Sequence, residues 1–212
     1  MRTNGLDTGL VGEVVEASTT DFLSQACRLD GAPPFGAFVH VPGGHDDVTI
    51  LGVVTQVQTT GIDPGARAVM RGHGEIRDEL IYRENPDLPL VLRTMFRVVV
   101  VGFDLEGTHR QFLPPRPARL HYSVYATPPK QVRAFTDTGL DYLRTLLSSP
   151  DTPVDELVAA NIRLTGQLRG EPEAFTHSAG RELAELLRAD YIRLAAVLRR
   201  CVGALEAPLA GP

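Results

Sequence analysis

The chain has 212 residues, of which 43% are hydrophobic, so it is long enough to build one substantial core or two small ones. Its formal net charge is −5, and its 21 basic residues form no run. This argues against tight binding of nucleic acid, because the release of counterions needs several clustered cations.

Cysteines and apolar runs indicate the compartment. Cys27 and Cys201 lie far apart, with no CxxC pattern and no histidine at metal-ligand spacing. The longest apolar runs, such as 98–103, are far shorter than the roughly 20 residues of a spanning helix, and the first residues hold no apolar run of signal length. We therefore expect a soluble cytoplasmic protein without a disulfide and without a membrane segment.

The first 125 residues predict six short strands. They are rich in β-branched or aromatic residues and are separated by turn-forming stretches such as GAPPFG, PGGHDD and TGIDPG. This pattern favours a small closed β-barrel, which leaves no exposed strand edge. The predicted strands are 10–17, 22–29, 37–41, 49–58, 95–103 and 120–125.

Residues 66–92 interrupt the strand pattern. The segment lacks strict alternation, carries charges of both signs, and contains Pro86 and Pro89, which stop any helix near Glu84. We predict a loop or short helix inserted between barrel strands. An insertion of this length in a compact barrel is usually either disordered or functional.

After Pro129 the apolar residues recur with helical spacing. Helices are predicted over 131–148, over 154–168 after Pro153, and over 173–205. The predicted fold is α+β: a barrel over 8–128, a three-helix region over 129–206, and a tail over 207–212.

Several motifs of the first half are similar to those of one known kind of barrel. They are GEVV at 12–15, Phe22, FGAFV at 35–39, LGVV at 51–54, NPDLP at 85–89 and RVVVVG at 97–102. In these motifs the chain resembles the HAS-barrel, the small barrel at the front of HerA-type DNA-translocating ATPases and at the crown of rotary ATP synthase subunits. Through PPFG (33–36), FLPPRP (112–117), LRTLL (143–147) and PVDELVAA (153–160), the whole chain also resembles short bacterial proteins in which this barrel stands alone before a helical tail.

The resemblance implies an assembly element without a motor. In HerA-type proteins the barrel leads into a P-loop ATPase domain, which needs a lysine followed by serine or threonine. The single lysine here, Lys130, follows two prolines and precedes Gln131. We therefore expect a non-catalytic module, without cofactor, that docks a protein partner or self-associates. The resemblance links such a module to DNA processing or an ATPase complex.

Candidate catalytic groups are few. The six histidines form no HxxxH or HExxH pair, so no metal site is predicted. An enzyme would need a site around 66–92 where His73 converges with Glu75, Asp78 or Glu79. Ser18 to Asp21 offers hydroxyls but no base, and is expected to form a turn. We predict that the protein is not an enzyme.

A weak nucleic-acid binder is the other alternative. Arginines and aromatic rings can hold phosphates and stack on single-stranded bases. The candidate contact residues, for nucleic acid or for a partner, are Arg97, Arg110, Arg116, Arg119 and Tyr125.

Overall fold

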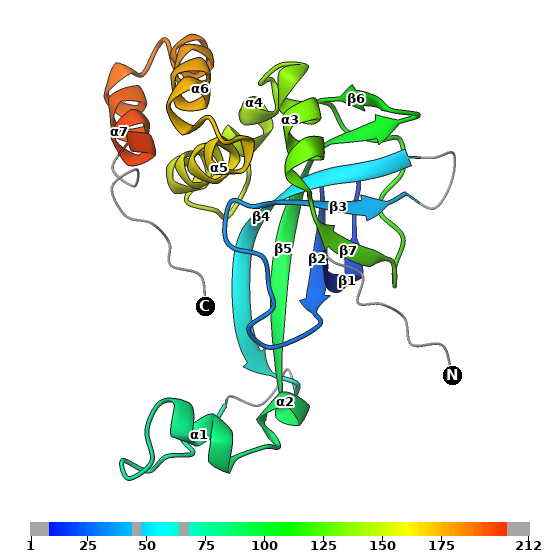
Figure 1. The fold of residues 1–212 in the computed structure, drawn as a ribbon, viewed down its shortest axis with the longest axis vertical. Coiled ribbons are helices and arrows are strands. Elements are labelled where there is room, and N and C mark those ends of the chain that lie inside the picture. Colours follow the sequence, from blue (N-terminus) through cyan, green and yellow to red (C-terminus); the bar gives the residue numbers. More distant parts are fainter. Residues whose placement is uncertain (1–8, 44–47, 64–67, 203–212) are drawn as a thin grey trace.

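The computed structural model describes residues 9–43, 48–63 and 68–202. Among these residues, six antiparallel strands pair in the closed cycle β1–β2–β5–β4–β3–β7, and β6 extends the sheet beside β5 (Figure 1). The predicted barrel is confirmed. The strands are β1 (Leu10–Ala17), β2 (Asp21–Ala26), β3 (Phe38–Pro42), β4 (Val48–Gly61), β5 (Leu92–Leu105), β6 (Thr108–Arg110) and β7 (Ser123–Ala126).

The range of β1 is as predicted, whereas the other five predicted strands begin or end at different residues. The strand predicted over 120–125 starts only at Ser123, because His121 has a φ of 66° and cannot continue an extended backbone. The short β6 is not among the predicted strands. It forms because Glu106 and Gly107, with φ of 51° and 80°, make a tight hairpin from β5 to β6.

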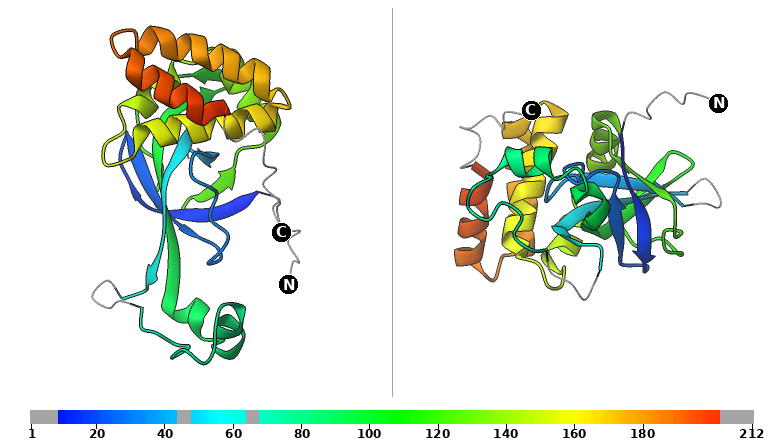
Figure 2. Two further views of the ribbon diagram at one scale, coloured as in Figure 1. Left: turned by 90° about the vertical axis from the view of Figure 1, so that its left-hand side faces the viewer. Right: turned by 90° about the horizontal axis from the view of Figure 1, so that it is seen from below.

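The strands β4 and β5 are each 14 residues long and outrun their neighbours. They pair from Val48 with Leu105 to Gly61 with Leu92, whereas β2 follows β5 only as far as Met95. Residues 59–61 and 92–94 therefore form a two-stranded ribbon that projects from the barrel, here called the arm (Figures 1 and 2).

The end of the arm carries the inserted segment. Its described residues, 62–63 and 68–91, are called the tip and contain α1 (Glu79–Glu84) and α2 (Leu88–Val91). The predicted helix stop near Glu84 is confirmed. Residues 66 and 67, at the start of the predicted insertion, lie outside the described residues.

The C-terminal helices are α3 (Pro129–Asp137), α4 (Tyr142–Leu147), α5 (Val154–Arg169), α6 (Pro172–Leu186) and α7 (Tyr191–Val202). The helices predicted over 131–148 and 173–205 are thus each divided in two. Gly139, with a φ of 141°, separates α3 from α4. Asp190 accepts a hydrogen bond at 3.0 Å from the Arg193 amide, so it caps the start of a separate α7.

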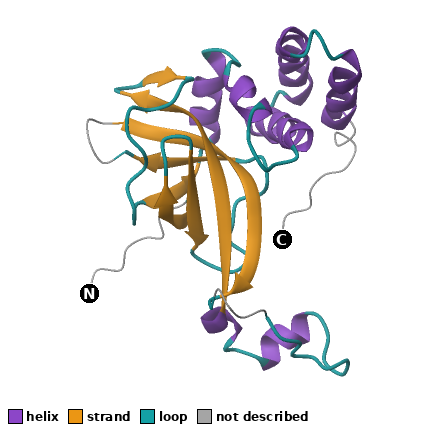
Figure 3. Cartoon of the chain, turned by 180° about the vertical axis from the view of Figure 1, so that it is seen from behind, coloured by secondary structure: helices purple, strands orange, loops and turns teal. Residues whose placement is uncertain are grey.

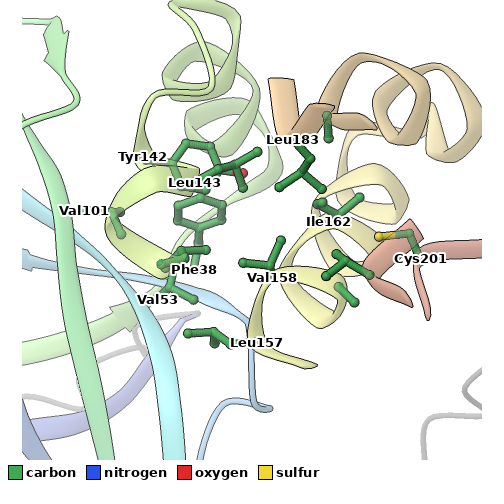
Figure 4. Packing of buried hydrophobic residues seen from close by; sticks show 14 of the residues in the cluster. Phe38, Val53, Val101, Tyr142, Leu143, Leu157, Val158, Ile162, Leu183 and Cys201 are labelled. Carbon is green, nitrogen blue, oxygen red and sulfur yellow. The ribbon is translucent and has the colours of Figure 1, made fainter. Parts of the chain in front are cut away.

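The barrel and the helices share a core. Residues of the barrel wall alternate between its interior and its outer face, and on β5 Val98 and Val100 point inward while Val99 and Val101 meet the helices. The helices lie at the end of the molecule away from the arm (Figure 3). Figure 4 shows the shared core, in which Phe38 of β3 packs against Tyr142 of α4, with ring centroids 5.4 Å apart.

A buried polar chain locks α5 to the barrel. Asn161 of α5 donates a hydrogen bond to the carbonyl of Gly36 at 2.9 Å and accepts one from the Tyr142 hydroxyl at 2.9 Å. Burial raises the pKa of Tyr142, which keeps that hydroxyl a donor. The bonds satisfy polar groups that would otherwise be costly inside the core.

Candidate docking surface

The base of the arm is fixed by a cross-strand pair of threonines. Thr59 and Thr94 face each other in the β4–β5 register, and their hydroxyls lie 2.7 Å apart. Thr94 also donates a hydrogen bond to the Leu29 carbonyl at 2.6 Å. The arm is thereby anchored to the loop after β2 before it extends away from the barrel.

Polar contacts hold the two helices of the tip together. Arg71 bonds the Asp87 carboxylate at 2.9 Å and the Asn85 side-chain oxygen at 3.4 Å. The Asn85 side chain in turn donates to the Ile81 carbonyl at 2.8 Å, near the end of α1. Ile62 closes the neck of the tip by donating its amide hydrogen to the Val91 carbonyl at 2.9 Å.

Between these elements the tip encloses an apolar groove of about 620 Å³. Nine of its twelve lining residues are apolar and two, Asp63 and Arg71, are charged. Hydrophobic walls with few polar groups are typical of surfaces that bind another molecule. The groove is lined by Gly61, Ile62, Asp63, Ala68, Val69, Arg71, Ile81, Tyr82, Leu88, Leu90, Val91 and Leu92.

The tip leaves most of its apolar side chains uncovered. Among its described residues, only Gly72 and Leu88 are buried. Isolated apolar residues on a surface are normal, but a contiguous group marks an interaction site or an aggregation-prone surface. The large exposed ones are Ile62, Val69, Met70, Leu80, Tyr82, Leu90 and Val91.

Other hollows of comparable size have a different character. The one between α4, α6 and α7, of about 580 Å³, is lined by five charged residues among nine. A smaller hollow beside α3, α5 and α6 contains Arg169, whose guanidinium already lies 2.8 Å from the Asp137 carboxylate and over the Phe175 ring. Arg169 thus serves contacts between helices, and the first hollow is mostly polar and charged, so the groove of the tip is the strongest candidate for docking.

The residues predicted for an enzymatic site lie on the tip but do not line the groove as described. His73, Glu75, Asp78 and Glu79 are exposed. His73 and Asp78 occupy turns, with φ of 46° and 52°. Among the described residues there is no group of three or more histidine, cysteine, aspartate or glutamate side chains that could hold a metal ion. Whether the protein has enzymatic activity stays a prediction.

Arg97 and Arg110 lie at different places along the sheet. Arg97, on β5, bonds Asp21 at 2.9 Å. Arg110 ends β6 opposite Phe103, six residues further along β5, or roughly 20 Å at the rise of a strand.

The other predicted contact residues are on the β6–β7 side. Arg116 is exposed in the connection before β7, and Arg119 lies 5.3 Å from the centre of the Tyr122 ring. Tyr125 stacks on His40 with ring centroids 5.4 Å apart, and burial lowers the pKa of His40. A role of these five residues in binding stays a prediction.

The sequence predicts the insertion but not the groove. The lining residues Val69, Leu90 and Val91 show neither helical nor strand periodicity, so they gave no signal of a shared face. The available signal was a group of apolar residues inside an otherwise charged segment flanking the NPD break. Which of these side chains stay uncovered depends on the projection of the arm, which no local pattern encodes.

No helix in the described part of the chain is both long and apolar enough to cross a membrane. A scan against protein-family models and a search of curated proteins find no match for this chain.

Proposed function

We propose that this chain is a non-catalytic assembly module of the HAS-barrel type, acting in the cytoplasm, which presents the tip of its arm to another protein chain. The observation that carries the proposal is the apolar groove at the end of a projecting ribbon. Covering a surface of this kind with a partner lowers the free energy, because apolar side chains are removed from water.

The architecture supports an assembly role in two further ways. The closed barrel agrees with the resemblance to the HAS-barrel. HerA-type and ATP synthase proteins use this barrel to build rings or to receive a partner. After the barrel, Lys130 follows Pro128 and Pro129 at the start of α3, where a HerA-type protein would begin its ATPase domain. By this resemblance, a DNA-processing or ATPase complex is the class of assembly to test first.

Removing the tip tests the proposal. Because Gly61 pairs directly with Leu92, residues 62–91 can be replaced by an Asn-Gly turn that closes the β4–β5 hairpin. We expect the full chain to form a complex of defined stoichiometry, with itself or with one protein, in light scattering and native mass spectrometry. The shortened chain should lose the complex and keep the thermal unfolding of the barrel and helices.

A full chain that stays monomeric at every concentration and forms no defined complex contradicts the proposal. An unchanged complex in the shortened chain would show that assembly uses a surface other than the tip.

A further inference from the structure

We infer that the groove of the tip is filled by the tip of a second copy of this chain, in a two-fold symmetric dimer. The inference rests on the proposed assembly function and names its partner. It requires that one surface offer both a projecting part and a matching hollow, because a two-fold interface uses the same patch on both subunits.

The tip offers both parts side by side. Val69 and Leu90 project at its surface, with 75% and 76% of their area exposed. Both also border the groove, whose walls include Ile62, Ile81 and Tyr82. Rotation about a two-fold axis therefore allows Leu90 of each copy to enter the groove of the other.

The tip also needs a cover whenever the chain is folded. α1 has six residues and α2 has four, and helices this short are not stable on their own in water. Within α1 no residue is buried, and within α2 only Leu88 is. A second copy is the one partner that is present wherever the chain itself is present.

The size of the surface is suited to a dimer. A stable interface buries about 800 Å² on each partner and uses 20–30 residues a side. The tip has 26 described residues, seven of which carry large exposed apolar side chains, so an interface that uses most of the tip reaches that size. Since the tip projects away from the barrel and the helices, two copies can meet there without contact between their bodies (Figures 1 and 2).

The charges of the tip are compatible with self-association. Residues 62–91 contain six acidic and four basic residues, so two tips repel only weakly at physiological salt. At the groove itself, Arg71 is already bonded to Asp87. The tip thus lacks the strong single-signed field that selects a partner of opposite charge.

A pair of matched substitutions tests the inference on the full-length chain. Leu90→Asp places a carboxylate in the proposed interface, whereas Ile192→Asp places one on α7 at a position that is 82% exposed. Because both side chains are largely exposed, neither change should disturb the fold, which thermal unfolding checks. In sedimentation velocity we expect a wild-type dimer, an unchanged Ile192→Asp dimer, and a dissociation constant raised at least about 30-fold by Leu90→Asp. Val69→Asp should act as Leu90→Asp does.

The other outcomes overturn the inference in distinguishable ways. A dimer that resists both tip substitutions refutes tip-to-tip pairing but leaves an assembly function in place. A monomer that forms a defined complex with a different protein, lost in Leu90→Asp, refutes the second copy and supports docking at the tip. A monomer without any defined complex refutes both proposals.

Discussion

Gly36 lies where the backbone of the barrel half closely approaches α5. Its φ is 86°, and a Cβ built there would lie 2.8 Å from the Ala160 Cβ and 2.9 Å from the Asn161 amide nitrogen. Glycine is therefore needed for two reasons, the left-handed backbone and the close approach of the helix. The PPFG motif that supported the resemblance contains this contact.

Alanine substitutions separate these two requirements. Gly107 has a similar φ of 80°, but a Cβ there would meet nothing within 4 Å. Gly107→Ala should lower the free energy of unfolding by about 1–2 kcal/mol, the cost of the left-handed backbone. Gly36→Ala should cost about 1–3 kcal/mol more, because the methyl group overpacks the junction. Urea unfolding of both variants measures the difference, and equal losses would contradict the described packing of α5.

His40 predicts a pH dependence of stability. Its Nδ1 is buried without a hydrogen-bond partner among the described residues, and burial lowers its pKa below the ordinary value of about 6.5. The unfolded chain therefore binds a proton below about pH 6.5 while the folded chain does not. Stability is complete above that pH and falls as the pH drops toward the folded-state pKa, by at most about 1.4 kcal/mol per pH unit.

Replacing the ring isolates this effect. His40→Phe keeps the stacking on Tyr125 and removes the titration, so the variant should lose less unfolding free energy than wild type between pH 7.5 and pH 5.5. His177→Gln, at an exposed position on α6, serves as the control and should follow wild type. A His40→Phe variant with the wild-type pH slope would contradict the lowered pKa.

The unbroken apolar run of β5 follows from its place between two cores. The interior of the barrel covers one face of the strand and the C-terminal helices cover the other, so four consecutive valines, 98–101, are buried. Strands with both faces buried lose the alternating pattern of a half-exposed strand.

Threonine substitutions on the two faces of β5 test this arrangement. Val100→Thr buries a hydroxyl inside the barrel and Val101→Thr buries one against the helices, and both valines are 1% exposed. Each change should lower the unfolding free energy by about 1–3 kcal/mol. Val57→Thr on β4, where the side chain is exposed, should be nearly neutral. A neutral Val101→Thr would show that the helices do not cover this face.

Strands and helix periods could be predicted from the sequence because they depend on local patterns. The range of β1 agrees with the prediction, and the start of α5 after Pro153 does also. The division between α6 and α7 could not, since Leu187 continues the apolar stripe and the break depends on a cap by Asp190. The missed β6 depended on Glu106 adopting a left-handed turn, which glutamate rarely favours.

At the scale of the whole molecule, the barrel and the helices form one body because outward-facing residues of the barrel wall, such as Val99 and Val101, belong to the core that it shares with the helices. The arm is the exception, since β4 and β5 continue beyond their neighbours and carry the tip away from both cores. The sequence predicted an insertion between these strands. It could not predict the groove, which arises when residues on either side of the tip, such as Ile62 and Leu90, come together in space.

The distance between spin labels on two copies tests tip-to-tip pairing most directly. Glu79→Cys places a label on α1 outside the groove lining, and Arg199→Cys places one on α7, both in a Cys27→Ser chain. Cys201 should remain unlabelled, because it is buried and burial raises its pKa to about 11. We predict a short, narrow distance between the two Glu79→Cys labels of a dimer and a longer one between the Arg199→Cys labels. A short distance between the Arg199→Cys labels, with no short distance between the Glu79→Cys labels, would contradict tip-to-tip pairing.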